Sequence, residues 1–157
     1  MAITLRLEGA PELTRRLNGA ARIVSDEERR AMTTSLLLIE ASARRNVRQD
    51  TRRLMNSITS AQRQEGNALV GRVGPSAGYG VMVERGTKPH WPPIAPLRAW
   101  ARRHGVSPYA VQRAIARRGT RARPFMAPAW AANAGRVAAL FAACGQRIVA
   151  RLSGGTA

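Results

Sequence analysis

Residues 25–48 read SDEERRAMTTSLLLIEASARRNVR, and this stretch decides the fold class. Ser25 and Glu28 stand in the spacing of a capping box, in which a hydroxyl and a glutamate satisfy the first free amides of a helix. One apolar stripe then continues at helical spacing through Met32, Leu36, Ile39, Ala43 and Val47. Acidic residues fill the first turn and arginines the last, as the helix dipole favours. A long helix is therefore predicted from about Asp26 to Arg48.

Upstream of this helix, the sequence predicts a strand and a shorter helix. Ile3, Leu5 and Leu7 alternate with polar residues before a glycine, which is the period of a half-buried strand. Pro11 then suits the first turn of a helix whose apolar residues recur every three or four positions as far as Val24. This short helix contains Gly19 as a weak point.

Downstream, the pattern changes to that of a small sheet. Two hairpin strands are predicted on either side of Gly66 and Asn67, the first over residues 54–62 and the second over residues 69–73. Residues 79–84 alternate in the manner of a third strand, which ends at Gly86.

The last third of the chain reads as helical. Four prolines predict a loop over residues 88–96, and two short helices are expected over residues 97–103 and 108–118, the second capped by Ser107. A basic loop over residues 117–123 contains Gly119 and leads to a long final helix that opens at Pro128. The tail over residues 153–157 is expected to be mobile.

Together these elements predict one α+β domain over residues 1–157. A small, mostly antiparallel sheet would be packed by the two long helices, with a short helical insertion at about residues 89–123.

Composition adds a strong charge and no sign of a membrane segment. The chain has 157 residues, of which 26 are basic and 9 acidic, giving a net charge of +17. Lys88 is the only lysine, so nearly all the cations are guanidinium groups, which pair with phosphates and with carboxylates alike. An acidic partner is expected, and nucleic acid and protein both remain open. No stretch is apolar enough to span a membrane and no secretion signal is apparent, so a cytosolic location during synthesis is expected.

The sequence gives little support to a catalytic or metal-binding function. Cys144 lies on the apolar stripe of the last helix, where a buried thiol is the favoured interpretation. His90 and His104 lack a second ligand at helical spacing and are expected to be surface or capping residues. A magnesium-dependent nuclease would need converging carboxylates, and the candidates Asp50, Glu65 and Glu84 show no spacing that brings two together. We therefore expect no enzyme activity, no metal site and no cofactor.

The two short helices over residues 97–118 allow two interpretations. They could form a helix-turn-helix in which Ser107, Tyr109, Gln112 and Arg113 meet phosphates or bases. The favoured alternative is a compact helical pair whose apolar residues pack on the main sheet; these are Leu97, Trp100, Val111 and Ile115.

Two runs in the sequence are similar to those of a known family. The run YGVMVERGT at residues 79–87 and the run RPFMAPA at residues 123–129 resemble the two signature stretches of the HK97 gp10-like family of tailed-phage proteins. The opening LEGAPELTRRL at residues 7–17 and the segment from Asp50 to Ile58 fit the same order. Arg52 stands where a glycine is usual, Gly80 where alanine is usual, and residues 89–118 form an extended insertion.

The resemblance implies a structural virion protein without catalysis. Such a protein forms a ring, expected to be a hexamer, at the head-tail junction or the head-proximal tail end, and acts in tail completion or head-tail joining. Its partners would be further copies of itself, a neighbouring stopper or connector, and a tail terminator or tail tube, with passing contact to genomic DNA and none to a membrane. It would reside in the neck or tail of the virion after assembly in the host cytoplasm. The alternative is a free DNA-binding protein that uses the helical pair at residues 97–118.

Contact residues and anchors are also expected. The subunit or partner interface is predicted to use Tyr79, Glu84, Arg85, Gly86, Thr87, Arg117, Arg118, Arg121 and Arg123. Structural anchors are expected at Trp100, Pro124, Phe125, Pro128 and Trp130. Gly86 would permit a positive φ angle, and Glu84 and Thr87 could equally close their own turn.

Overall fold

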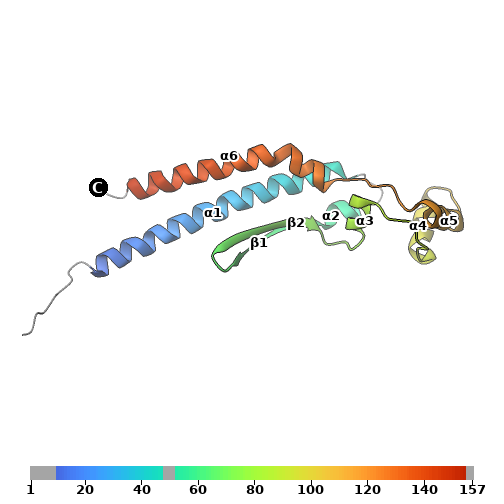
Figure 1. Ribbon diagram of the computed structural model, residues 1–157, viewed down its shortest axis with the longest axis horizontal. Coiled ribbons are helices and arrows are strands. Elements are labelled where there is room, and N and C mark those ends of the chain that lie inside the picture. Colours follow the sequence, from blue (N-terminus) through green and yellow to red (C-terminus); the bar gives the residue numbers. More distant parts are fainter. Residues whose placement is uncertain (1–9, 48–51, 155–157) are drawn as a thin grey trace, which may run out of the picture. The chain divides into compact units, whose positions relative to one another are not determined.

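The computed structural model describes residues 10–47 and 52–154, and its architecture is α+β (Figure 1). The elements in chain order are α1 (Ala10–Asn46), α2 (Arg53–Ser57), β1 (Ile58–Glu65), β2 (Ala68–Pro75), α3 (Gly80–Arg85), α4 (Ile94–Arg103), α5 (Pro108–Arg118) and α6 (Met126–Ser153). The predicted class is confirmed, with a sheet of two antiparallel strands among the described residues. The strand expected at residues 3–8 and the last three residues of the tail lie outside the described residues.

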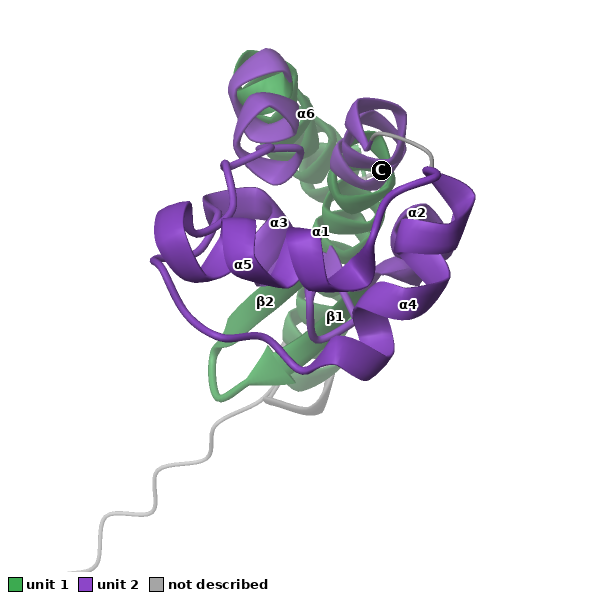
Figure 2. Ribbon diagram, turned by 90° about the vertical axis from the view of Figure 1, so that its right-hand side faces the viewer, with its two compact units in different colours: residues 1–38, 61–72, 133–157 green, residues 39–60, 73–132 purple. Residues whose placement is uncertain are grey.

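The chain forms two compact units, each assembled from separate segments (Figure 2). Unit 1 comprises residues 1–38, 61–72 and 133–157, and unit 2 comprises residues 39–60 and 73–132. Each unit therefore takes a part of α1, of the hairpin and of α6.

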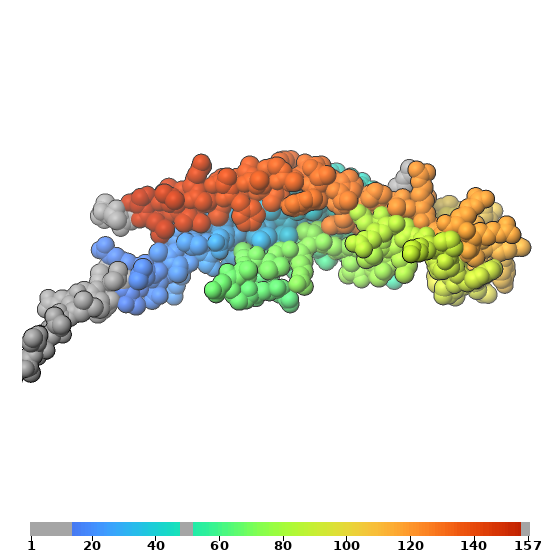
Figure 3. Space-filling view, viewed as in Figure 1, coloured from blue at the N-terminus to red at the C-terminus, as the bar shows by residue number. Residues whose placement is uncertain are grey.

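In unit 1, α1 lies between the hairpin and α6 (Figures 1 and 3). A side chain at Gly71 would run into Met32 and Leu36, so the β2 backbone packs closely on α1. On the other side of α1, the carboxylate of Glu27 accepts a hydrogen bond from Nε of Arg147 at 2.8 Å and lies 3.3 Å from Arg151. The final helix thus pairs with α1 in this unit, rather than lying on the hairpin.

The predicted break between two helices before Asp26 is wrong. A single helix runs from Ala10 to Asn46, because no proline interrupts it after residue 11 and one internal glycine costs only about 1 kcal/mol. Glu27, an acidic residue of the predicted first turn, is 1% exposed and forms ion pairs with α6. The hydrogen bond from Arg147, with the charges of Arg151 and Arg30, lowers the pKa of Glu27 against the opposing effect of burial. The capping-box pair Ser25 and Glu28 therefore lies inside a continuous helix, where no free amide is left to cap.

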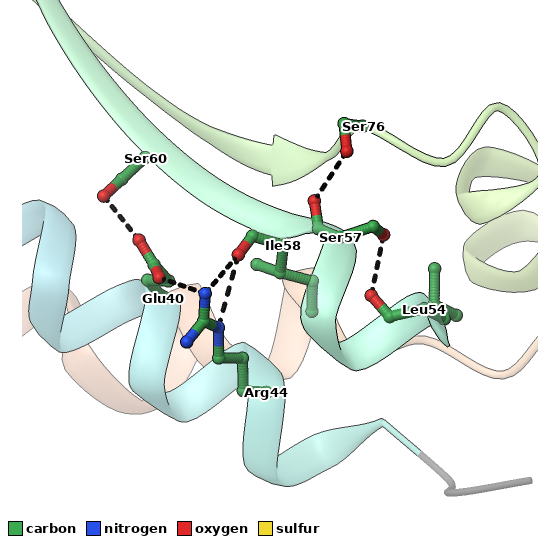
Figure 4. Close-up of polar contacts among 7 residues, drawn as sticks. All are labelled: Glu40, Arg44, Leu54, Ser57, Ile58, Ser60 and Ser76. Carbon is green, nitrogen blue, oxygen red and sulfur yellow. Dashed lines mark hydrogen bonds and ion pairs between the residues drawn. The ribbon is translucent and has the colours of Figure 1, made fainter. Parts of the chain in front are cut away.

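In unit 2, the end of α1 holds the start of the hairpin (Figure 4). Arg44 donates from Nη2 to the carbonyl oxygen of Ile58 at 2.7 Å and pairs with Glu40 at 2.7 Å, while Ser60 donates to the same carboxylate at 2.5 Å. Ile58 is fully buried. The Ser76 amide donates to the carbonyl oxygen of Ser57 at 2.8 Å and so closes the two strands at this end.

Two segments predicted to be extended are helical. The hairpin is confirmed, but residues 54–57 belong to α2, where the Ser57 hydroxyl donates to the carbonyl oxygen of Leu54 at 2.7 Å and closes a turn. The third strand predicted over residues 79–84 is wrong, because residues 80–85 form α3. Backbone bonds from Gly80 to Ala77 and from Val83 to Tyr79 fix these turns locally. Strand-like alternation over six residues was too short to exclude a helix.

The two short helices predicted over residues 97–103 and 108–118 are confirmed, with a small shift of the first boundary. Helix α4 begins at Ile94 instead of after the predicted loop, since Pro96 is tolerated in a first turn. Helix α5 runs over the predicted residues with Ser107 at the cap position, but the Ser107 side chain makes no capping hydrogen bond. Helix α6 starts at Met126, two residues before Pro128, and includes Ser153. Cys144 is buried, as predicted.

Candidate functional site

The end of α3 and the start of α6 meet at one carboxylate in unit 2. Glu84 accepts hydrogen bonds from three consecutive backbone amides, those of Phe125 at 2.7 Å, Met126 at 2.9 Å and Ala127 at 2.9 Å. The two runs that carry the family resemblance, residues 79–87 and 123–129, are therefore in direct contact. Glu84 closes a contact within its own chain, but with a distant segment instead of its own turn.

The electrostatics of this contact favour an ionised Glu84. Burial raises the pKa of the carboxyl group, but the three amides and the charge of Arg85 outweigh it, so that the pKa is lowered from 4.5. The amides belong to the N-terminus of α6, where the helix dipole also stabilises negative charge. Glu84 thus caps a 28-residue helix from outside that helix.

Backbone pairing extends the contact in both directions. The Arg123 amide donates to the carbonyl oxygen of Val83 at 2.8 Å. Thr87 and Thr120 form an antiparallel bridge with two backbone bonds of 3.1 Å, and their hydroxyl oxygens lie 3.1 Å apart. We call residues 83–87 and 119–127 the Glu84 clasp.

Two glycines allow the clasp to close. Gly86 has φ 71°, as the sequence predicted, and Gly119 has φ 69°. A Cβ at Gly86 would run into the backbone of Thr120 and Ala122, and one at Gly119 into the carbonyl group of Thr87. Both positions therefore exclude a side chain by backbone conformation and by space.

The expected anchors differ in burial. Phe125 is 1% exposed, and Asn46 at the end of α1 donates to its carbonyl oxygen at 3.2 Å. Trp100 stacks on His104 with ring centroids 4.1 Å apart and stays partly exposed. Trp130 is 54% exposed, so its ring does not fill a core within the described residues.

A pocket of about 580 Å³ opens beside the clasp in unit 2. Apolar side chains from five segments line it, among them Leu54, Met55, Val83 and Phe125. Three arginines, Arg52, Arg121 and Arg123, also line it, and each is exposed. Sequence reasoning proposed Arg121 and Arg123 as contacts but gave Arg52 no role.

The other predicted contact residues surround the insertion and the clasp. Tyr79 lines the pocket and is 39% exposed. Arg117 and Arg118 end α5 and are exposed, as is Arg85 at the end of α3. Neither Arg117 nor Arg118 forms an ion pair with a carboxylate in the part of the chain that the structure describes.

The carboxylates considered for a nuclease serve other roles. Glu65 pairs with Arg63 and Arg72, and Glu84 is held by the clasp. Asp50 lies outside the described residues. Within residues 10–47 and 52–154, no group of three His, Cys, Asp or Glu side chains could hold a metal ion.

One protein family is similar to the first part of the chain. A model of the HK97-gp10-like family, described as "Bacteriophage HK97-gp10, putative tail-component", matches residues 11–86. Residues 11–86 are thus similar to this family of phage tail components. The match to these phage tail components ends at Gly86 and so leaves out the insertion and the second half of the clasp. The curated proteins and the solved structures gave no significant match. No described helix is long and apolar enough to cross a membrane.

Proposed function

We propose that this protein is a structural subunit of a phage tail that assembles with copies of itself into a ring. The ring, a hexamer, would sit at the head-tail junction or the head-proximal tail end and act in tail completion or head-tail joining, without catalysis. The family match to tail components supports the virion location. Partners would be a stopper or connector on one side and a tail terminator or tail tube on the other.

The observation that carries the proposal is the large apolar surface left in solvent. In unit 2, Val81 and Met82 on α3 are 59% and 56% exposed, and Trp91 is 69% exposed. In unit 1, Phe141 and Leu152 are partly exposed and lie three turns apart on α6, so they share one face of that helix. Contiguous apolar patches mark interaction surfaces in soluble proteins, and we propose that these side chains belong to two such patches. A ring needs two different complementary patches on each subunit, and the two units supply one each.

The basic loop after α5 is proposed to face a neighbouring subunit or acidic virion protein. Arg117, Arg118, Arg121 and Arg123 would slow the genome by pairing with phosphates if they lined its passage. A position facing other proteins, with only passing contact to DNA, avoids that difficulty.

Assembly can be tested on the purified protein by light scattering and negative-stain imaging. We expect rings for the wild-type chain and their loss when Val81 and Met82 are both changed to aspartate. A matched control is Thr59→Asp, which adds a carboxylate at an exposed polar position of β1. Gold labelling should place the protein at the neck of phage particles. A wild-type chain that stays monomeric and is missing from particles would contradict the proposal.

A gel-shift titration across salt separates this function from the alternative of a free DNA-binding protein. The helical pair α4 and α5 carries exposed arginines at Arg98, Arg102 and Arg113, which could meet DNA. Weak binding that disappears near physiological salt fits a structural subunit, while tight, sequence-dependent binding by the monomer would favour the alternative.

A further inference from the structure

We infer that the pocket beside the Glu84 clasp binds an acidic peptide segment of a neighbouring protein. An apolar side chain of that segment, flanked in sequence by carboxylates, would occupy the pocket. The inference rests on the proposed function only in that this neighbour would be another virion protein. The recognition chemistry is argued from the pocket itself, which lies wholly within unit 2.

No described carboxylate compensates the positive charge of the pocket. Arg52, Arg121 and Arg123 line it, and none of the acidic residues within 10–47 and 52–154 does. The acidic residue nearest in sequence to the pocket wall, Glu84, already accepts three amides. None of the three arginines forms an ion pair with a described carboxylate. Guanidinium groups beside an apolar surface pair best with planar anions that accept two hydrogen bonds, and a carboxylate is such an anion.

Arg52 holds a backbone conformation that favours glycine. Its φ is 57° and its ψ is −5°, and it is the one non-glycine residue with positive φ among those the structure describes. Such a conformation costs about 1 kcal/mol or more for a residue with a Cβ, and strained residues cluster at ligand sites. A strained arginine at the pocket wall indicates that its side chain has a role there.

The apolar walls favour a peptide over nucleic acid. Leu54, Met55 and Val83 are half-buried and Phe125 is fully buried, so the pocket can shelter an apolar side chain from water. Duplex DNA presents phosphates to exposed cations and has no apolar group that reaches such a space without unstacking a base.

A second copy of this chain is a poor source of the acidic segment. Nine acidic residues face 26 basic ones in the sequence. Of the described carboxylates, Glu27, Glu40 and Glu65 form ion pairs within the chain, and Glu84 is in the clasp. Asp26 and Glu28 are exposed on α1, but the residue between them is the buried Glu27 and not an apolar side chain. A second copy therefore offers no described segment in which carboxylates flank an exposed apolar residue, and the inferred ligand belongs to a different protein.

The test is a fluorescence anisotropy titration of the full-length protein with a labelled peptide, acetyl-Glu-Asp-Leu-Phe-Asp-Glu-amide. Two control peptides replace either the two apolar residues by serines or the four acids by their amides. We expect each control to bind about tenfold or more weakly, because one loses burial and the other loses the ion pairs. Equal binding of the serine control would overturn the inference, as would no saturable binding of the first peptide.

Variants locate the site. Arg121→Glu and Arg52→Gly should each lower the affinity for the first peptide about tenfold. Because Arg52→Gly also relieves the strained backbone, misfolding cannot explain its loss of affinity. The control Arg136→Glu makes the same charge change on an exposed residue of α6 that does not line the pocket, and should change affinity less than about twofold. Equal losses in Arg136→Glu and Arg121→Glu would show general charge attraction and refute the pocket.

A competition arm separates the ligand classes and the two proposals. Single-stranded oligothymidine should fail to displace the peptide at physiological salt, and displacement at lower concentration than the peptide itself would assign the pocket to nucleic acid. Light scattering on the same samples reports assembly separately. Rings without peptide binding would overturn this inference alone, and peptide binding without rings would overturn the proposed function alone.

Discussion

Replacing Glu84 tests whether one carboxylate holds the start of α6. Glu84→Ala removes the acceptor of three amide hydrogen bonds from Phe125, Met126 and Ala127. A hydrogen bond to a charged group contributes about 1.5–3 kcal/mol, but water can solvate amides at a helix end, so the three do not add fully. Loss of an N-cap costs about 0.5–2 kcal/mol and loss of the charge at the helix N-terminus up to about 2 kcal/mol. We expect Glu84→Ala to lower the free energy of unfolding by about 3 kcal/mol.

The amide variant divides this effect between geometry and charge. Glu84→Gln keeps one oxygen that can accept two hydrogen bonds and removes the charge, so it should cost about 1–2 kcal/mol. The assay is urea unfolding at pH 7, followed by circular dichroism at about 222 nm, where the helices dominate the signal. Glu28→Ala, at an exposed position of α1, serves as the control and should change stability by less than about 0.5 kcal/mol.

The pH dependence has a defined sign. The pKa of Glu84 is lowered in the folded protein from 4.5, so its contribution is complete above that value and is lost as the pH falls through the folded pKa. The gap between wild type and Glu84→Gln should therefore shrink in acid. A Glu84→Ala variant as stable as Glu28→Ala at pH 7, or a gap that stays constant in acid, would refute the reasoning.

Three further predictions concern single residues. Gly119→Ala should lower the free energy of unfolding by more than about 2 kcal/mol, because φ is positive and the new Cβ meets Thr87. Gly135→Ala, with open space inside α6, should raise it by about 0.5–1 kcal/mol. Similar urea midpoints for the two variants would contradict this. Glu27→Gln should lower the urea midpoint at pH 7 because it leaves the Arg147 pair without its charge, and an unchanged midpoint would show that the pair adds nothing. Cys144 should react with a thiol reagent only on unfolding, since it is 3% exposed; rapid labelling of the native protein would contradict its burial.

Local patterns were sufficient for the hairpin and the insertion. Gly66 adopts φ 60° in the turn between Glu65 and Ala68, as the Gly66–Asn67 pair predicted. Pro108 following Ser107 gave the start of α5 to the residue. These features depend on neighbours in sequence, which is why periodicity and turn chemistry could predict them.

Long-range partners were beyond the same reasoning. Glu27 was interpreted as one of the acidic residues of a first helical turn because its partners Arg147 and Arg151 are 120 and more residues away. Glu84 was expected either to meet a neighbouring subunit or to close its own turn. Its carboxylate accepts from backbone amides of a distant segment, and such amides, which every residue except proline carries, leave no signature in sequence. An arginine gives no local signal for positive φ at position 52, and the one hint in the sequence was the family resemblance, in which a glycine is usual there.

The bridge between Thr87 and Thr120 has a consequence for the whole segment from residue 88 to residue 119. Its two ends lie side by side, at the separation that a two-residue hairpin turn spans. Removing or replacing the segment at this bridge would therefore leave the path of the rest of the chain unchanged, which is the geometry at which domain insertions are tolerated. The family match stops at Gly86, one residue before this bridge, so it does not extend to α4 and α5.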